Sequence, residues 1–226
     1  MSSKILMLRH GITEGNKNRW FYGALDLPLL PEGREALLMQ KEEGIYPPIP
    51  EGAKFYTTGK GRTLETLETL FGERPHEVIK DLREMEFGEY EGHSFDELQE
   101  DPGFQEWLND ETGNYTLPGG ESRNQFNERV LRGTEELISR HMDAKPRDEE
   151  NDVQSKSLEE SGEENEEMSV VICHGGVICA IMDFMFSNEK EDMWQWMVEP
   201  GSGYLVEIEN GSPINYMQIG KNMVYY

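Results

Sequence analysis

The sequence is poor in cysteine and in long apolar runs, and each shortage excludes a class of protein. Its 226 residues include two cysteines, Cys173 and Cys179, too few for a disulfide framework or a cysteine metal cluster. We expect both to be buried, reduced thiols. No apolar run approaches the ~20 residues that span a bilayer, and the N-terminal run at residues 5–8 is too short for a signal peptide. These features predict a cytoplasmic protein without a membrane partner.

Basic residues are also scarce. Lysine and arginine total 21 against 45 acidic residues, and the formal net charge is −24. This charge argues against nucleic acid and anionic membranes as partners. A small anionic substrate remains compatible, because salt screens surface charge over about 8 Å and local arginines set the potential inside a pocket. Residues 143–168 carry 11 acidic and three basic residues, a composition that predicts a solvated, flexible insertion.

Strand and helix signals alternate through most of the chain. A continuous apolar run at residues 5–8 is typical of a strand buried on both faces, a second buried strand is expected at 169–173, and weaker strands are expected at 54–57 and 78–79. Helices are expected at 32–44, 64–71, 126–138 and 178–186. An Asn210-Gly211 turn predicts a closing hairpin. This order predicts an α/β fold, a three-layer αβα sandwich with a mostly parallel central sheet, as a single domain over residues 1–226.

Two histidines stand directly after the two buried strands. His10 and His174 are each followed by glycine, and Arg9 precedes the first. Ligands of such sheets bind at the carboxyl ends of strands, so these side chains are expected at one site. A neutral imidazole can attack phosphorus and hold it as phosphohistidine, and arginine donors suit phosphoryl oxygens. Positioning and electrostatics supply most of the catalysis, so the pattern predicts phosphoryl transfer without a metal or other cofactor.

Six sequence blocks extend this pattern along the chain. They are Arg9-His10-Gly11-Ile12-Thr13-Glu14-Gly15-Asn16, residues 23–33 with Asp26 and Leu29, residues 58–66 with Arg62, residues 82–92 with Glu84, Pro118-Gly119-Gly120-Glu121-Ser122, and residues 170–176. In this order they resemble the histidine phosphatases, the superfamily that includes the cofactor-dependent phosphoglycerate mutases. Only the acidic insertion lies clearly outside the resemblance, which implies a phosphoglycerate mutase-like fold.

The resemblance also implies a role for each matching residue. His10 would be the phosphorylated nucleophile, and Arg9, Arg62 and His174 would clamp the phosphoryl oxygens. Glu84 would protonate the leaving alkoxide and then help to activate water. Further substrate contacts are implied for Thr13, Asn16, Gly23 and the backbone at Gly175.

Elementary chemistry sets two requirements on these roles. His10 must be neutral at Nε2 to attack, so a backbone carbonyl is expected at its Nδ1. A dianionic phosphate beside Glu84 would raise the pKa of that carboxyl and keep it protonated when needed. By spacing alone Glu86, Glu89 or Glu91 could equally be the acid, and the register of the resemblance selects Glu84.

The arginine loop departs from the family pattern. Thr58-Gly59-Lys60-Gly61 stands where many members have Ser-Pro-Leu, and we expect Lys60 to be solvated, with substrate contact as the alternative. Outside the blocks, His76, His93 and His141 are expected at the surface, His93 being a candidate for the pocket mouth.

These residues favour a metal-independent phosphatase that hydrolyses small-molecule phosphate monoesters through a phosphohistidine. The partner expected is a small phosphorylated metabolite, and the oligomeric state is open between monomer and homodimer. A phosphoglycerate mutase is the first alternative, but the 25 residues between Gly92 and Pro118 contain no lysine or arginine to hold a second anionic group. The other alternative is a catalytically silent phospho-ligand-binding module, which the intact set of candidate catalytic residues argues against.

Overall fold

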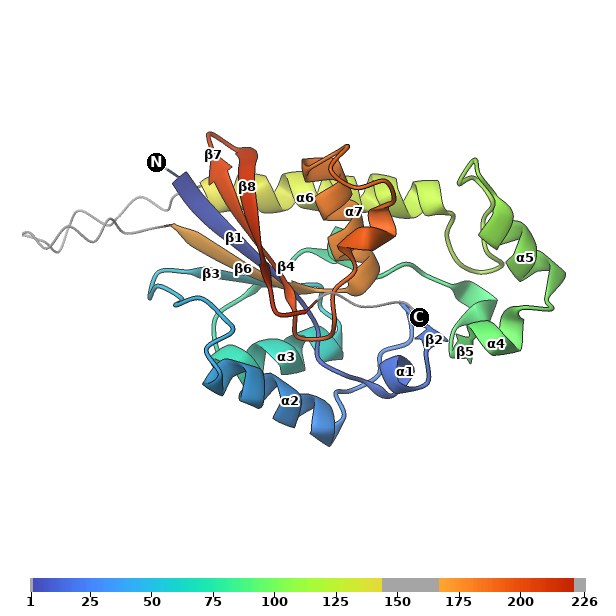
Figure 1. Ribbon diagram of the computed structural model, residues 1–226, viewed down its shortest axis with the longest axis horizontal. Helices are drawn as coiled ribbons and strands as arrows, with labels where there is room; N and C mark the ends of the chain where they lie inside the picture. Colours follow the sequence, from blue (N-terminus) through green and yellow to red (C-terminus); the bar gives the residue numbers. More distant parts are fainter. Residues whose placement is uncertain (1, 144–166, 222–226) are drawn as a thin grey trace, which may run out of the picture.

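A six-stranded sheet forms the centre of the protein in the computed structural model, which describes residues 2–143 and 167–221 (Figure 1). Its strands are β1 (Ser2–Arg9), β3 (Lys54–Thr57), β4 (Glu77–Val78), β6 (Met168–Cys173), β7 (Gly203–Glu209) and β8 (Ser212–Ile219). They lie in the order β4-β3-β6-β1-β7-β8. The first four in this order are parallel to one another, and β7 pairs antiparallel with β1 and β8. The predicted mostly parallel sheet and closing hairpin are confirmed.

Helices cover both faces of this sheet. The α-helices are α1 (Glu14–Lys17), α2 (Pro31–Glu42), α3 (Gly61–Phe71), α4 (Phe95–Leu98), α5 (Pro102–Asn109), α6 (Arg123–Met142) and α7 (Gly175–Met185). The described residues also include three short 3₁₀ turns, η1 (Lys80–Leu82), η2 (Gly88–Tyr90) and η4 (Met193–Trp196). Figure 1 shows α2 and α3 on one face and α6 and α7 on the other, which is the predicted three-layer sandwich. Within the described ranges, no helix has an apolar stretch of the length that a bilayer requires.

The central strands contribute side chains to two hydrophobic cores, one on each face of the sheet. Ile5 and Met7 of β1 pack toward α6 and α7, whereas Leu6 and Leu8 pack toward α2 and α3. All four side chains are fully buried. Successive residues of a strand point to opposite faces, so a strand covered on both sides needs apolar residues throughout. This requirement explains the continuous apolar run that marked the strand in the sequence.

Strand register brings the candidate residues to one edge of the sheet. Arg9 of β1 pairs with Cys173 of β6, and Thr57 of β3 pairs with Ile172 of the same strand. The three strands therefore end at nearly the same level. The residues that follow them, including His10 and His174, leave the sheet side by side, and the His10 N–H donates to the Cys173 carbonyl at 3.0 Å.

A two-stranded sheet lies apart from the central one and was not predicted. It pairs β2 (Trp20–Phe21) with β5 (His93–Ser94) in antiparallel fashion. The ring centroid of Phe21 lies 5.3 Å from those of Phe87 and Phe104. The contact with Phe104 packs the two-stranded sheet against α5. Strands of two residues carry no periodic signal, so the sequence could not reveal them.

Three sequence expectations need correction or lie outside the described residues. Helix α7 begins at Gly175 rather than at residue 178. The sequence did not indicate this earlier start because two glycines, which are poor helix formers, occupy the first turn. His141 is buried rather than exposed: its ring contacts the hydroxyls of Ser169 at 2.8 Å and Ser3 at 2.7 Å, joining β6 to β1. The predicted insertion at 143–168 falls outside the described residues except at 143, 167 and 168, and Met168 belongs to β6.

Candidate active site

The structure brings the two candidate histidines into contact. Their ring centroids are 5.3 Å apart with planes at 66°, and their exposed fractions are 3% for His10 and 0% for His174. Each follows the last residue of a parallel strand, and His174 is the N-cap of α7. The sheet register therefore creates the predicted convergence of two imidazoles that are 164 positions apart in the chain.

His10 carries its proton on Nδ1. This atom lies 2.8 Å from the Gly11 carbonyl oxygen, and because a carbonyl only accepts hydrogen bonds, Nδ1 must be the donor. Burial, followed by the charges of Arg62 and Arg9, holds the pKa of His10 well below its usual value of 6.5. The ring is therefore neutral at physiological pH, and its Nε2 lone pair is available. The predicted backbone carbonyl at Nδ1 is confirmed.

His174 adopts the opposite tautomer. The Arg62 Nε–H donates to His174 Nδ1 at 3.3 Å, so a neutral ring must carry its proton on Nε2, which donates to Thr58 Oγ1 at 2.9 Å. Burial and the Arg62 charge also hold the pKa of His174 well below 6.5. One histidine thus presents an acceptor nitrogen and the other a donor nitrogen, which suits a nucleophile beside a group that stabilises negative charge.

The Arg62 guanidinium is fixed inside the protein. Its side chain is fully buried at the start of α3 and lies 5.0 Å from the Tyr22 ring centroid. Nη1 donates to the Leu25 carbonyl at 2.9 Å, and Nη2 donates to the Gly23 carbonyl at 3.1 Å. A guanidinium held by several acceptors loses little freedom when an anion arrives, so it is a preorganised cation.

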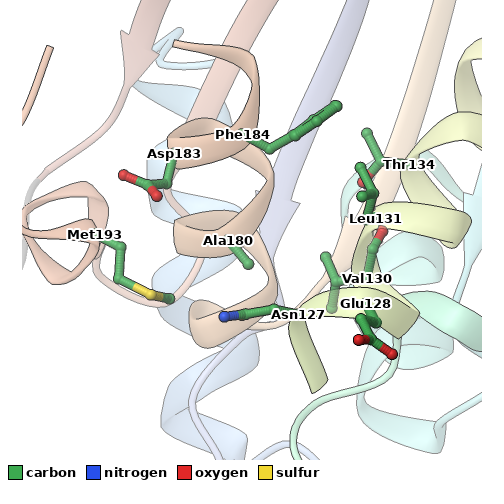
Figure 2. Close-up of a pocket in the computed structure, with 9 residues that line it drawn as sticks. All are labelled: Asn127, Glu128, Val130, Leu131, Thr134, Ala180, Asp183, Phe184 and Met193. Atoms are coloured by element: carbon green, nitrogen blue, oxygen red, sulfur yellow. Dashed lines mark hydrogen bonds between the residues drawn. The ribbon is translucent and has the colours of Figure 1, made fainter. Parts of the chain in front are cut away.

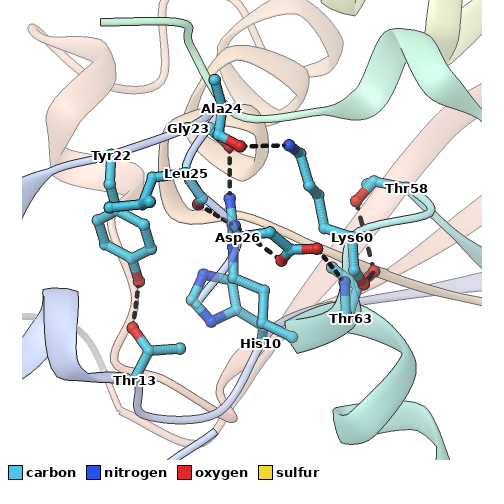
Figure 3. Close-up of polar contacts among 12 residues, drawn as sticks. His10, Thr13, Tyr22, Gly23, Ala24, Leu25, Asp26, Thr58, Lys60 and Thr63 are labelled. Atoms are coloured by element: carbon cyan, nitrogen blue, oxygen red, sulfur yellow. Dashed lines mark hydrogen bonds and ion pairs between the residues drawn. The ribbon is translucent and has the colours of Figure 1, made fainter. Parts of the chain in front are cut away.

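Glu91 anchors the loop that holds Arg62. Its carboxylate accepts hydrogen bonds from the three backbone N–H groups of residues 23–25 and from that of Phe87, all at 2.9–3.0 Å. The Gly23 and Leu25 carbonyls accept from Arg62, and the Ala24 carbonyl faces Lys60 (Figure 3). Residues 23–25 are therefore held between the Glu91 carboxylate and the cations of Arg62 and Lys60. The sequence did not reveal this anchoring role of Glu91.

Lys60 is held by the protein rather than solvated. Its Nζ donates to the Ala24 carbonyl at 2.7 Å, and its side chain is half-buried (Figure 3). Burial and the neighbouring Arg62 charge lower the pKa of Lys60. The expectation of a fully solvated lysine is corrected by this bond, which the sequence could not reveal because its acceptor is a backbone carbonyl of a distant segment.

Thr13 and Asn16 form the capping box that starts α1. The Asn16 Oδ1 accepts from the Thr13 N–H at 2.9 Å and from the Tyr22 hydroxyl at 3.1 Å. Thr13 Oγ1 lies 2.6 Å from the same hydroxyl (Figure 3). These bonds commit the Asn16 oxygen to the protein, so only Nδ2 can donate to a ligand. Tyr22, which the sequence analysis missed, links this cap to Arg62.

Glu84 is the carboxylate that reaches the candidate site. Its Oε2 accepts from the Gly176 N–H at 3.0 Å, in the first turn of α7, and its Oε1 accepts from the Met85 N–H. Burial raises the pKa of Glu84, and the two N–H donors and nearby arginines only partly offset this. We expected a bound phosphate to raise this pKa, whereas the protein itself already does so.

The other three carboxylates of the block have different surroundings. Glu86 lies 3.5 Å from Arg83 in a partly exposed ion pair, Glu89 is exposed, and Glu91 anchors the loop at residues 23–25. Since only Glu84 contacts the first turn of α7, the geometry favours Glu84 over its neighbours as the acid.

Arg9 lies against the start of α7. Its Nη1 donates to the Val198 carbonyl at 2.7 Å. A Cβ at Gly175 would approach the Arg9 guanidinium carbon to 3.2 Å and the Met197 sulfur to 2.7 Å, so a glycine is required for this close packing. The remaining surface candidate, His93, is exposed in β5 and bonds to the Glu91 carbonyl.

A separate hollow of about 290 Å³ lies between α6 and α7 (Figure 2). Leu131, Ala180 and Phe184 contribute to its apolar lining, and none of the predicted site residues borders it. It is therefore distinct from the candidate active site. Across residues 2–143 and 167–221, no group of three or more His, Cys, Asp or Glu side chains is arranged to hold a metal ion.

Comparison with known proteins agrees with this architecture. A Hydrogenobacter thermophilus protein named "Putative phosphoserine phosphatase 2" is 25% identical over 195 residues, which cover 84% of this chain and 82% of that protein. A Salmonella choleraesuis protein named "Probable phosphoglycerate mutase GpmB" is 28% identical over 130 residues, which cover 56% of this chain and 59% of that protein. The crystal structure of the alpha-ribazole phosphatase from Shigella flexneri has the same fold, with a TM-score of 0.73 at 20% identity over 99% of both chains.

The family profile is the most direct of these comparisons. Residues 5–145 match the histidine phosphatase superfamily, branch 1. This range includes most of β1 and the His10 that follows it, the arginine loop with Arg62, and the block that carries Glu84. The chain belongs to the histidine phosphatase superfamily.

Proposed function

We propose that this protein is a metal-independent phosphatase that hydrolyses small phosphate monoesters through a phosphohistidine at His10. The observation that carries the proposal is a neutral His10 with its proton fixed on Nδ1, set beside the preorganised Arg62 and His174. These groups supply a nucleophile and the fixed donors that phosphoryl transfer needs, so positioning and electrostatics can replace a metal.

In the first step, His10 Nε2 attacks phosphorus. The N–P bond forms as the P–O bond to the leaving group breaks, and Glu84 gives its proton to the departing oxygen. Arg9, Arg62 and Asn16 Nδ2 donate to the phosphoryl oxygens, with the backbone at Gly175 beside them. The His174 Nε2–H joins them by turning from Thr58 Oγ1 to the phosphoryl group. The raised pKa of Glu84 favours the protonated form that this step requires.

In the second step, water attacks the phosphohistidine. Glu84, now ionised, accepts a proton from the water as the O–P bond forms and the N–P bond breaks. Phosphate leaves, and both His10 and Glu84 return to their starting states. The same carboxyl group thus serves as acid and then as base, which is possible because its two bonds from Met85 and Gly176 also tolerate the ionised form.

Hydrolysis is favoured over mutase chemistry by the cap between Gly92 and Pro118. This segment forms β5, α4 and α5, contains no lysine or arginine, and packs aromatic rings against Phe21. A mutase must hold a second anionic group on its substrate, and the cap supplies no cation for it. Relatives named as phosphatase and as mutase both match the chain, so direct assay must decide.

The test is phosphate release from a panel of phosphomonoesters by wild-type protein in the presence of a chelator. Turnover under these conditions supports the proposal, and a requirement for added metal contradicts it. Isomerisation of 3-phosphoglycerate with a bisphosphoglycerate primer would instead identify a mutase. No turnover on any substrate would favour a catalytically silent binding module.

The pH dependence of kcat/KM is expected to reflect His10 and Glu84. His10 must be neutral, and its lowered pKa keeps it so down to a pH well below 6.5. Glu84 must be protonated, so activity falls as pH rises through its pKa, which lies above 4.5. We therefore expect Glu84→Gln to remove the alkaline fall while leaving the acid one. A Glu84→Gln profile with an unchanged alkaline fall would exclude Glu84 as the acid.

Gly176→Ala is expected to slow turnover by displacing Glu84. The new Cβ would lie 2.6 Å from Glu84 Oε1, so the carboxylate must move and lose its bond to the residue 176 N–H. Since misplacement of a reacting group by about 1 Å can cost about 10²-fold, we expect a 10- to 100-fold loss of kcat. Gly52→Ala, at a site with nothing within 4 Å, is the matched control. Equal kcat for the two variants would contradict the placement of Glu84.

A further inference from the structure

Arg129 and Glu121 form a buried ion pair against the segment that carries Glu84. Arg129 projects from α6 with an exposed fraction of 8%, and Glu121 immediately precedes the Ser122 cap of the same helix. Neither residue is part of the proposed phosphoryl clamp. The pair lies beside residues 81–86, which run from η1 to the loop after Glu84.

Every N–H of the Arg129 guanidinium has an acceptor. Nη1 donates to the carbonyls of Asp81 at 2.9 Å and Arg83 at 2.8 Å. Nη2 donates to the carbonyl of Glu84 at 3.3 Å and to the Glu121 carboxylate, and Nε donates to the other oxygen of that carboxylate at 3.2 Å. Three of the five donors thus fix three peptide groups of one short segment, including that of the proposed acid itself, and the other two hold Glu121.

Glu121 holds the same segment from its other end. Its Oε1 accepts from the Glu86 N–H at 3.0 Å, and its own N–H donates to the Glu86 carbonyl at 3.0 Å. Two glycines allow this close approach: a Cβ at Gly120 would lie 2.3 Å from the Glu86 carbonyl oxygen, and one at Gly133 would lie 3.0 Å from the Asp81 carbonyl carbon. Residues 81–86 are therefore fixed at both ends by one ion pair and its flanking backbone.

Neither attraction of a phosphate nor an effect on the pKa of Glu84 explains why this ion pair is present. Glu121 neutralises Arg129, so the pair offers no net attraction to a phosphate. The charged side chains that lower the pKa of Glu84 are Arg62 and Arg9. Arg129 reaches Glu84 only through its backbone carbonyl, while the Glu84 carboxylate points to the first turn of α7. Arg129 therefore acts on the position of the Glu84 backbone rather than on its charge. Any effect on the Glu84 carboxyl group must come from where residues 81–86 are held.

We propose that Arg129 and Glu121 are positioning residues that set the reach of the Glu84 carboxyl group to the leaving-group oxygen. This inference rests on the proposed function, in which Glu84 is the general acid. It predicts that loss of the pair impairs protonation of the leaving group and spares the attack by His10.

The experiment compares two substrates that differ in their need for an acid. Cleavage of an alkyl phosphate releases a strongly basic alkoxide, which needs a proton as it leaves. Cleavage of p-nitrophenyl phosphate releases a stable p-nitrophenolate anion, which does not. For Glu84→Gln we expect kcat/KM to fall about 10²-fold on the alkyl ester and only about threefold on the aryl ester. For Arg129→Met we expect the same selectivity, with a loss of about 10- to 100-fold on the alkyl ester.

Four further variants separate positioning from general damage. Arg132→Met is the matched control, because Arg132 lies one turn along α6 and contacts the same segment only through the exposed Asp81 carboxylate at 3.3 Å. Glu121→Gln and Arg129→Lys keep similar size and carry the same test if Arg129→Met does not fold, as monitored by circular dichroism. The double variant Glu84→Gln/Arg129→Met should be no more selective than Glu84→Gln, because both changes act on one proton transfer.

Equal losses on the two esters in a folded Arg129 or Glu121 variant would overturn the positioning role while leaving the phosphatase proposal intact. If Glu84→Gln itself showed equal losses, Glu84 would not be the acid, and the inference would fail together with that assignment. Additive selectivity in the double variant would show that the pair acts on some other group.

Discussion

His10→Ala is expected to abolish turnover on every phosphomonoester that the wild-type protein hydrolyses. The change removes the only protein atom proposed to bond to phosphorus, so the reaction would have to proceed by direct attack of water on the substrate. Loss of a nucleophile in covalent catalysis lowers kcat by about 10⁶-fold, and we expect a comparable loss here. The measurement is steady-state kcat on aryl and alkyl phosphates, together with covalent labelling of the protein by a ³²P-phosphate ester.

The fold should survive this substitution. His10 makes one side-chain hydrogen bond, to the carbonyl of the next residue, and the strand register is set by backbone pairing and by the apolar residues of β1. A matched control is His76→Ala, which removes the same atoms from an exposed position. Retention of the ³²P label or of more than about 1% of kcat in His10→Ala would place the nucleophile elsewhere.

The location of the site could be predicted from the sequence because it depends on strand ends. A continuous apolar run identifies a strand buried on both faces, and parallel neighbours end at the same edge of a sheet. Those two rules place His10 and His174 at one edge of the sheet, and the observed pairing of Arg9 with Cys173 shows that their strands are also neighbours. The tautomer of His10 followed from the chemistry of attack and was also predictable.

The contacts that hold the site in shape could not be predicted in the same way. The Glu91 carboxylate accepts hydrogen bonds from four backbone N–H groups, and the Arg129 guanidinium donates hydrogen bonds to three backbone carbonyls. Such bonds depend on where peptide groups of distant segments point, which residue types do not encode. His141 was misassigned for a related reason, since its partners Ser3 and Ser169 are small polar residues on strands far away in the sequence.

The electrostatics of the site follow from burial rather than from the overall charge of the protein. The chain has a formal net charge of −24, yet His10 and His174 are both held neutral by burial and by the Arg62 cation. In the proposed mechanism the fixed guanidinium attracts the phosphate while the nucleophile stays unprotonated. Arg62 would then have two effects, one on the bound anion and one on the pKa of His10, and they can be measured separately.

Arg62→Met is expected to lower kcat/KM by about 10³-fold, since loss of one preorganised donor costs about 10²–10³ and this guanidinium also positions His174. The pKa of His10 should rise because the Arg62 charge lowers it in the wild type. His10 would then become protonated at a higher pH, so the acid limb of the kcat/KM profile should move toward neutrality. The measurement is this pH profile with p-nitrophenyl phosphate.

The same substitution should destabilise the fold, because it leaves the carbonyls of Gly23 and Leu25 without their donors. Gly23 is buried whereas Leu25 is exposed, and one unpaired buried polar group costs about 1–3 kcal/mol, so we expect a loss of about 2 kcal/mol in urea unfolding. Arg34→Met is the control: it removes a partly exposed arginine paired with Glu65 at 2.6 Å, and such pairs contribute about 1 kcal/mol or less. A rate loss with an unmoved acid limb would show that Arg62 acts through hydrogen bonds alone, and a loss of less than tenfold would contradict its place in the phosphoryl clamp.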